Sequence, residues 1–163
     1  MRRSSQLLLL LAVLVVTACL DASPFVPKIE DVGYAPSLGV NLTASTRTAN
    51  GAYYRDITVG GGTRVRSDSG GDTLSIRYTG YLRDGTAFDT NIGGTLFTFV
   101  TGAANVIDGM DEGVRGMRQG GTRQIIIPPA LGYGGVRFGT IPPNSILIFT
   151  VEAVTVKTSA AAP

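Results

Sequence analysis

Short stretches in which every second residue is apolar recur along the chain, and this alternation predicts β-strands with one buried face. Residues 72–83 show it most clearly, with Leu74, Ile76 and Tyr78 on one face. Asp84-Gly85 follows directly, a dipeptide typical of a tight hairpin, so the chain is expected to reverse there. This reversal predicts an antiparallel sheet, and similar patterns predict further strands over residues 54–59, 96–100, 122–127 and 145–156.

One segment has helical rather than alternating spacing. In residues 108–117, Met110, Val114 and Met117 fall on one face, and Asp108 is in position to cap the first turn. Three glycines in this segment disfavour a helix, each by up to about 1 kcal/mol relative to alanine. Packing must therefore supply its stability. A short amphipathic helix among strands that each need one face covered indicates an α+β fold, with the sheet curled around the helix.

The first residues, 1–18, have the layout of a secretory signal peptide, because two arginines precede an apolar run over residues 7–16. That run is short for a permanent transmembrane helix, which needs about 20 apolar residues. The sequence Val16-Thr17-Ala18-Cys19 also resembles the lipobox of bacterial lipoproteins, in which the cysteine becomes the lipid-modified first residue. The alternative is an ordinary signal peptide with a cysteine near its cleavage site.

The lipobox interpretation predicts an exported protein that is anchored in the cell envelope by a lipid on Cys19. If the source is a Gram-negative cell, Leu20 in place of aspartate after the cysteine favours the outer membrane, facing the periplasm. Whichever membrane is meant, we expect the lipid anchor to be the only part of the protein that contacts it.

Residues 19–51 are rich in Pro, Ser, Thr, Ala and Asn, and neither helical nor strand periodicity lasts for more than a few positions. This composition predicts a flexible tether, with a short pairing of Asn41-Leu42 to the domain as an open alternative. Residues 52–157 are then the folded domain. Residues 158–163, polar and alanine-rich, are expected to be a disordered tail.

The amino-acid composition excludes several classes of catalytic and binding site. The 163 residues include no His, no Trp and a single Cys, which excludes Ser-His-Asp triads, His-ligated metals, disulfide frameworks and CxxC redox pairs. The formal net charge is +2, and without Arg2 and Arg3 the basic residues equal the 12 acidic ones. A neutral mature chain with no basic cluster gives no electrostatic case for nucleic acid. We expect neither a metal nor another cofactor.

A series of short motifs runs through residues 52–156, nearly all of the predicted folded part. They include Arg77-Tyr78-Thr79-Gly80-Tyr81-Leu82, Asp84-Gly85-Thr86-Ala87-Phe88-Asp89, Val106-Ile107-Asp108-Gly109, Ile127-Pro128-Pro129-Ala130-Leu131-Gly132-Tyr133-Gly134 and Ile141-Pro142-Pro143. In this order and spacing they resemble the FK506-binding-protein (FKBP) family of peptidyl-prolyl cis-trans isomerases. The resemblance implies a five-stranded antiparallel β-sheet wrapped around one short α-helix, in agreement with the α+β pattern.

The resemblance also implies the site residues. The catalytic ones would be Asp89, Tyr133, Phe88 and Tyr78, and the substrate-binding ones would be Phe97, Val106, Ile107, Met110, Ile141 and Phe149. By the same resemblance the Tyr133 hydroxyl and the Ile107 amide would hold carbonyl oxygens, and Asp89 would favour the twisted amide. Other interpretations remain open: core packing for the phenylalanines, a turn tyrosine for Tyr133, and a structural turn or salt-bridge carboxylate for Asp89.

Two function classes follow from the residues and the resemblance. The first is a prolyl isomerase that assists the folding of exported proteins by stabilising the twisted Xaa-Pro amide in an apolar pocket. The second is a noncatalytic proline-binding or chaperone module on the same fold. The expected partners are proline-containing unfolded or partly folded polypeptides and FK506-like macrolides. Met110 stands where many eukaryotic relatives carry Trp, and no amphipathic dimerisation helix is present, so we expect weaker macrolide binding and a monomer.

Overall fold

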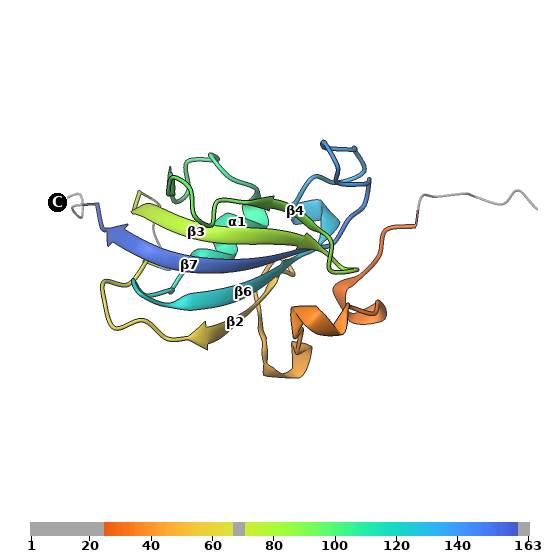
Figure 1. Cartoon of the computed structure of the whole chain (residues 1–163), viewed down its shortest axis with the longest axis horizontal. Coiled ribbons are helices and arrows are strands. Elements are labelled where there is room, and N and C mark those ends of the chain that lie inside the picture. The colour runs from red at the N-terminus through yellow and green to blue at the C-terminus, as the bar shows by residue number, and fades with distance from the viewer. Residues whose placement is uncertain (1–24, 67–70, 160–163) are drawn as a thin grey trace, which may run out of the picture.

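The computed structural model describes residues 25–66 and 71–159, and one antiparallel sheet organises them (Figure 1). Its strand order is β1-β2-β6-β7-β3-β4, with β5 also paired to β3. The strands are β1 (Thr46–Arg47), β2 (Tyr53–Thr58), β3 (Thr73–Leu82), β4 (Ala87–Thr90), β5 (Phe97–Val100), β6 (Thr122–Ile127) and β7 (Leu147–Lys157). One α-helix, α1 (Asp108–Val114), lies in the curve of the sheet.

This arrangement confirms the predicted α+β class, an antiparallel sheet around one helix, but the sheet has seven strands instead of five. The two additional strands are short. β4 is the return strand of the hairpin at Asp84-Gly85, and β1 is a two-residue strand that pairs with Tyr53 and Tyr54. A two-residue segment cannot show alternation, and in β4 two apolar residues are followed by two polar ones, which is no alternating pattern.

The helix differs from its predicted form at both ends. Its N-cap residue is Ile107, with no side-chain cap hydrogen bond, so Asp108 is the first helical residue and not the cap. There its carboxylate lies where the helix dipole favours negative charge. The helix ends at Val114 because Arg115 adopts extended backbone angles. Met117, which was predicted to be helical, follows the helix and is buried.

The glycines of α1 are required by its packing against β6. A Cβ atom on Gly109 would lie 2.3 Å from Ile127, and one on Gly113 would lie 2.4 Å from Ile125, closer than side chains approach in folded proteins. Glycine alone lets the helix axis come this near to the sheet. The residues that disfavour the helix in isolation therefore make its tertiary packing possible.

A buried arginine ties the carboxyl end of α1 to the sheet. Arg123 on β6 is only 3% exposed, and its Nη1 donates hydrogen bonds to the carbonyl oxygens of Gly113 (2.9 Å) and Arg115 (2.8 Å). Its Nε donates to Asp56 Oδ1 at 2.7 Å, and the guanidinium carbon lies 4.2 Å from the centre of the Tyr54 ring. These contacts pair the buried charge and satisfy carbonyls that a helix end leaves without partners.

The predicted tether is wrong for the residues that the structure describes. Residues 29–47, which we call the strap, lie against the outer face of the sheet and form three 3-10 helices: η1 (Ile29–Asp31), η2 (Pro36–Leu38) and η3 (Leu42–Ala44) (Figure 1). Ile29 is 2% exposed and packs in a cluster with Ile126 and Ile148 of the sheet and with Ile146, which directly precedes β7.

Hydrogen bonds fix the strap in place. Gln124 Nε2 donates to the Leu38 carbonyl at 2.7 Å, and the Ala35 amide donates to the Arg83 carbonyl at 2.8 Å. Asn41 caps η3 by accepting from the Ala44 amide, so the pairing suggested for Asn41-Leu42 is replaced by the pairing of β1.

The predicted C-terminal tail begins with residues that are bound to the domain. The Ser159 amide donates to Asp72 Oδ1 at 3.1 Å, and Arg66 binds the same fully buried carboxylate, so the expected tail is held at its first residues. Residues 160–163, the predicted signal peptide and Cys19 lie outside the described residues. Among the helices of the described ranges, none has the length and apolarity needed to cross a membrane.

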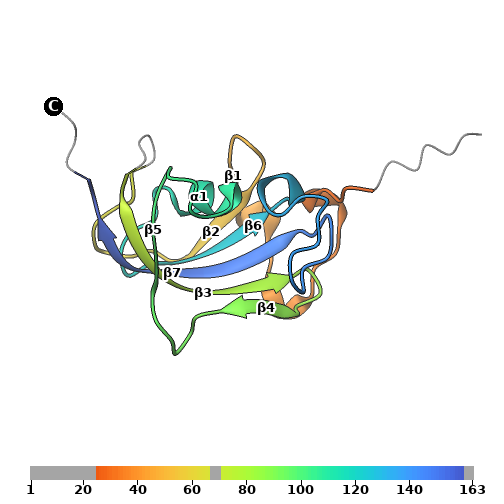
Figure 2. The same ribbon diagram turned by 90° about the horizontal axis from the view of Figure 1, so that it is seen from above.

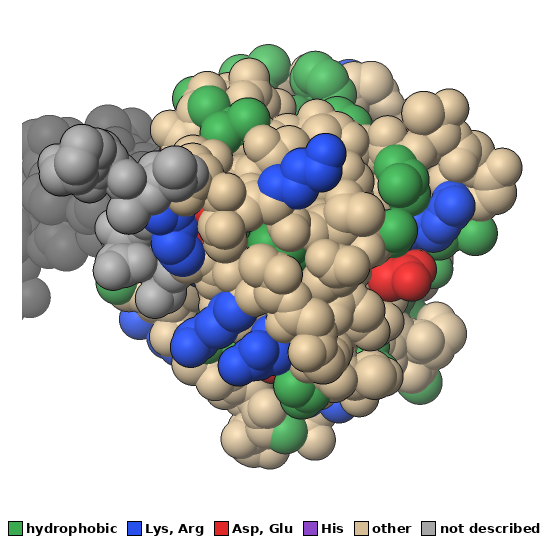
Figure 3. Space-filling view, turned by 90° about the vertical axis from the view of Figure 1, so that its left-hand side faces the viewer, with side chains coloured by type: hydrophobic (Ala, Val, Ile, Leu, Met, Phe, Trp, Pro, Cys, Tyr) green, Lys and Arg blue, Asp and Glu red, His purple; other side chains and the backbone are tan. Residues whose placement is uncertain are grey.

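Charged side chains are dispersed where β7 ends. Figure 3 shows this end of the molecule, where some Lys and Arg side chains touch and others are separated by uncharged surface. Such an arrangement makes no continuous basic patch on this face, in keeping with the near balance of charges along the chain.

Candidate active site

A cavity of about 300 Å³ opens between the concave face of the sheet and the start of α1. Five elements contribute to it: β3, β4, β5, β7 and α1, together with the loop after η4 (Pro129–Leu131) (Figure 2). Its lining is largely apolar and aromatic, and consists of Ile76, Tyr78, Phe88, Asp89, Phe97, Asn105, Val106, Ile107, Met110, Tyr133, Phe138 and Phe149.

Several aromatic rings of this pocket contact one another, two of the pairs edge to face. Phe149 on β7 meets Phe88 on β4 with ring centres 5.5 Å apart and planes at 86°, and it lies 6.0 Å from Tyr78 on β3. Phe97 on β5 approaches Tyr78 at 6.0 Å and 76°. Met110 is 5% exposed and lies within the same core cluster. Edge-to-face contacts of this kind hold rings in fixed orientations, which makes the pocket a preformed apolar surface.

One carboxylate lies among these rings. The Tyr78 hydroxyl donates a hydrogen bond to Asp89 Oδ2 at 2.6 Å, which fixes the carboxylate at the pocket edge. Burial, together with this hydrogen bond, raises the pKa of Tyr78 to about 12. Tyr78 therefore remains a hydrogen-bond donor at any physiological pH.

The Tyr133 hydroxyl and the Ile107 amide are pocket donors for which the described part of the chain supplies no acceptor. Burial raises the pKa of Tyr133, and the negative charge of Asp89 raises it further, so the hydroxyl keeps its proton. An apolar pocket with two available donors suits a ligand that is mostly hydrocarbon and carries carbonyl groups.

Comparison with known proteins agrees with this geometry. The family model described as FKBP-type peptidyl-prolyl cis-trans isomerase matches residues 65–154. The chain belongs to the FKBP family.

Among its relatives is FK506-binding protein 3 of Yarrowia lipolytica, 39% identical over 133 residues, which cover 82% of this chain and 32% of the relative. Another is the peptidyl-prolyl cis-trans isomerase FKBP15-3 of Arabidopsis thaliana, 34% identical, with 74% of this chain and 85% of the relative covered. The crystal structure of FkpA from Escherichia coli superposes with a TM-score of 0.62 at 34% identity, covering 70% of this chain and 52% of that one. The first curated relatives are much longer than the matched region, which spans about a quarter to a third of their length.

The structure brings nine of the ten predicted site residues of this FKBP domain to one pocket. The exception is Ile141, which is 3% exposed and lines a smaller adjoining cavity of about 140 Å³ together with Phe88, Asp89 and Tyr133. Ile141 belongs to the hydrophobic core cluster and does not line the main cavity. The predicted lipidation site, Cys19, lies outside the described residues.

Three lining residues were not predicted: Ile76, Asn105 and Phe138. Phe138 stacks on Tyr133 with ring centres 4.3 Å apart and planes at 6°, although it is 58% exposed. An aromatic residue within a glycine-rich loop is a signal that could have found it. Ile76 shares the alternation that places Tyr78 on the concave face, so its pattern was also available, whereas nothing in the sequence marks Asn105.

Proposed function

We propose that this chain is a peptidyl-prolyl cis-trans isomerase that acts on unfolded or partly folded polypeptides outside the cytoplasm. The observation that carries the proposal is the preformed aromatic pocket in which the Tyr78–Asp89 pair and the Tyr133 hydroxyl meet. Membership of the FKBP family supports it. A noncatalytic proline-binding module on the same fold is the second candidate, because a pocket that binds proline need not lower the barrier to rotation.

The proposed reaction requires no bond to be broken. Rotation about an Xaa-Pro amide is opposed by a barrier of about 18–20 kcal/mol, which arises from the partial double-bond character of the C–N bond. The twisted amide loses that resonance and its charge separation, so an apolar site binds it better than it binds either planar form. A gain of 10⁵-fold needs only about 7 kcal/mol of such differential binding.

Each polar group of the pocket then has one task. The Tyr133 hydroxyl and the Ile107 amide donate hydrogen bonds to substrate carbonyls and orient the peptide. Asp89, held by the Tyr78 hydroxyl at 2.6 Å, places negative charge beside the rotating amide. The proline ring contacts Phe97, Phe149 and Met110, and the absence of histidine from the chain is no obstacle because no proton is transferred.

A protease-free prolyl-peptide assay tests the proposal. Tyr133→Phe removes one hydrogen bond, worth about 1 kcal/mol, and should lower kcat/KM about 5-fold. Asp89→Val should cost more than 10-fold, since it removes the charge beside the amide. Glu152→Gln, an exposed carboxylate on β7, is the matched control and should leave kcat/KM unchanged.

The results separate the two candidates. Full activity in both pocket variants would contradict the roles given to Tyr133 and Asp89. A wild-type chain that binds prolyl peptides without accelerating their isomerisation would establish the noncatalytic module instead. Titration of a fluorescent prolyl peptide on the same preparations measures that binding.

We also propose that the mature protein is a monomer, lipid-anchored at Cys19 in the cell envelope. The lipobox-like sequence supports the anchor, and the strap begins only ten residues after Cys19. The domain would then be held close to the membrane rather than at the end of a long tether. Metabolic labelling with a fatty-acid analogue tests this: the label should be present in the wild type and lost in Cys19→Ser, whereas label that persists in the variant contradicts the anchor.

FK506-like macrolides are proposed ligands of the same pocket. Met110 offers a flexible thioether in place of a flat ring, and ordering it costs of the order of 1 kcal/mol. Binding of a rigid macrolide should therefore be weaker than in relatives with Trp. Met110→Trp should tighten macrolide binding more than it raises peptide turnover, and a folded variant with unchanged macrolide affinity would contradict this role of Met110.

A further inference from the structure

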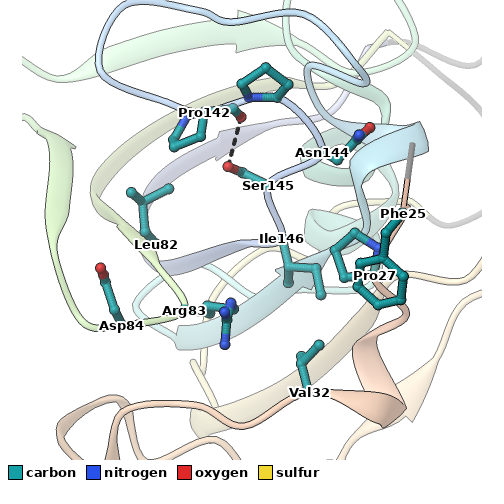
Figure 4. A pocket seen from close by; sticks show the side chains of 11 residues that line it. Phe25, Pro27, Val32, Leu82, Arg83, Asp84, Pro142, Asn144, Ser145 and Ile146 are labelled. Atoms are coloured by element: carbon teal, nitrogen blue, oxygen red, sulfur yellow. Dashed lines mark hydrogen bonds between the residues drawn. The ribbon is translucent and has the colours of Figure 1, made fainter. Parts of the chain in front are cut away.

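A second cavity, of about 460 Å³, lies where β3 ends and β7 begins. Three walls form it: the residues leading into the strap, the β3–β4 turn at Leu82–Asp84, and the segment Pro142–Ile146 before β7 (Figure 4). We call this cavity the groove. None of the residues placed in the active site lines it, so it is a separate surface.

The groove has the chemistry of a site for extended polypeptide. Phe25 and Pro27 on one side, and Leu82 and Pro142 on the others, supply apolar surface, and Phe25 is 79% exposed although it is a large apolar side chain. Apolar surface exposed in this way around a concavity commonly marks a binding site.

Polar groups at the edge complete the site. The side chains of Arg83 and Asn144 lie on different sides of the groove, and neither makes a hydrogen bond within the described residues (Figure 4). A bound polypeptide in extended form needs such donors and acceptors for its backbone amides. An apolar floor with a few polar groups at the edge meets both needs.

The wall formed by residues 142–146 is held by hydrogen bonds before any ligand binds. The Ser145 hydroxyl donates to the Pro142 carbonyl at 2.7 Å, and two successive prolines restrict the backbone there. The Asn144 amide donates to the Gly134 carbonyl at 2.7 Å, which joins the two ends of the loop. A preformed wall lowers the entropic cost of binding.

The groove and the active site share one loop, residues 133–146. Tyr133 and Phe138 line the pocket, Ile141 lines the small cavity beside it, and Pro142 and Pro143 line the groove. A polypeptide with its proline in the pocket necessarily continues beyond the pocket edge. The smaller cavity shares four lining residues with the pocket, and its lining residue Ile141 directly precedes Pro142 of the groove.

We propose that the groove binds an apolar, extended segment of the same polypeptide whose proline occupies the active site. This inference rests on the proposed isomerase function and deepens it, since it makes long unfolded chains better substrates than short peptides. Two contacts on one chain raise affinity because the second forms within an existing complex. The strap residues, expected from the sequence to be a tether, would then help to bind substrate.

The experiment compares two ligands on the full chain: a five-residue prolyl peptide and a twenty-residue unfolded peptide with the same proline and an apolar flank. The groove variant is Phe25→Asp with Arg83→Ser. Its matched control is Val26→Asp with Lys28→Ser. This variant also replaces one apolar residue by Asp and one basic residue by Ser, but at exposed positions beside Phe25 that do not line the groove. Fluorescence anisotropy measures binding, the prolyl-peptide assay measures turnover, and thermal melts confirm folding.

The groove variant should weaken binding of the long peptide about 10-fold, because burying one phenylalanine is worth about that or more, and should leave the short peptide within about twofold. The control should change neither. Equal losses for both peptides, or no loss for the long one, would overturn the proposal. A third variant lacking residues 20–24 tests the neighbouring segment of this chain as the occupant, and a rise in long-peptide affinity on deletion would overturn the assignment to substrate.

Failure of the isomerase proposal gives a different result. In that case neither peptide is turned over, yet binding still reports on the groove: a long peptide that binds more tightly than the short one, through Phe25 and Arg83, supports the groove in a noncatalytic protein. Equal binding of the two peptides overturns the groove whether or not the chain catalyses isomerisation.

Discussion

The two faces of the sheet are covered by different kinds of structure, and successive residues of β6 divide between them. Ile125 and Ile127 pack on the concave face, against α1 and the core beside the pocket. Ile126 packs on the outer face, against the strap. Arg123 and Gln124 follow the same alternation, since Arg123 binds carbonyls at the end of α1 and Gln124 binds the Leu38 carbonyl of the strap.

One face of β6 therefore lies on the side of the functional pocket, and the other face lies under the structural covering segment. The concave face leaves a cavity beneath one short helix, and the aromatic pocket lies there. The outer face bears a segment of 3-10 turns that buries isoleucines. The consequence of a substitution in β6 or β7 therefore depends on whether its position in the strand is odd or even, and the following four predictions test this division.

The largest effect is expected for Arg123→Met. It leaves the carbonyls of Gly113 and Arg115 without their donor and breaks the ion pair with the partly exposed Asp56, which together should cost about 3–5 kcal/mol of unfolding free energy. Because α1 carries the pocket residue Met110 and Ile107 is its N-cap, kcat/KM should fall as well. Urea melts and the peptide assay measure the two effects. Arg55→Met, which loses a bond to the strap at Gly39, should cost below about 1 kcal/mol, and an equal cost in both variants would contradict the prediction.

Ile29→Ala should be next, with a loss of about 2–4 kcal/mol, because it opens a cavity under the strap where Ile29 is 2% exposed. Turnover of a short prolyl peptide per folded molecule should remain unchanged, since the outer face does not reach the active site. Ile57→Ala, at a position 50% exposed, is the control and should change stability by less than about 0.5 kcal/mol. Lost turnover at full folding would show that the two faces are coupled.

Gly113→Ala should have a smaller net cost, of about 1–2 kcal/mol. The new Cβ would lie 2.4 Å from Ile125, and overpacking of this kind costs about 1–3 kcal/mol, partly offset by the higher helix propensity of alanine. Gly61→Ala, where nothing lies within 4 Å of the added atom, is the control. A thermal melt that rises in Gly113→Ala would mean that helix propensity, and not the approach of α1 to β6, limits stability.

The smallest effect concerns alkaline pH and compares one tyrosine from each face. Burial, followed by the charge of Glu30, raises the pKa of Tyr34 in the strap to about 12, and Tyr78 in the pocket has a similar value. An unfolded tyrosine has a pKa of about 10, so each contribution is complete below pH 10 and is lost as the pH rises towards 12.

Tyr34→Phe and Tyr78→Phe should each make the melting temperature fall less steeply between pH 10 and 12 than it does in the wild type. Melts at half-unit pH intervals measure the slope. An unchanged slope in either variant would show that its hydroxyl ionises as in the unfolded chain.

Much of the fold could be predicted because the alternation in β3 and the hairpin at Asp84-Gly85 are local signals. The family resemblance was enough to assign nine residues to the pocket. Their arrangement around one cavity depends on the packing of strands that are far apart in the sequence. The strap was misjudged, although a signal was present: the consecutive apolar residues 125–127 and 146–149 indicate strands buried on both faces. A second covering layer follows from such runs, and residues 29–47 provide it.

Local sequence patterns were enough to predict five of the strands, the position of the helix and the chemistry available to the pocket, because each depends on neighbouring residues or on the residue types present. Three features could be recognised only in the tertiary structure: the close packing that Gly109 and Gly113 allow, the strap formed by residues 29–47, and the stacking of Phe138 on Tyr133. These features depend on contacts between segments distant along the chain. Local propensity cannot report such contacts, because the energy that decides them comes from packing after the chain has folded.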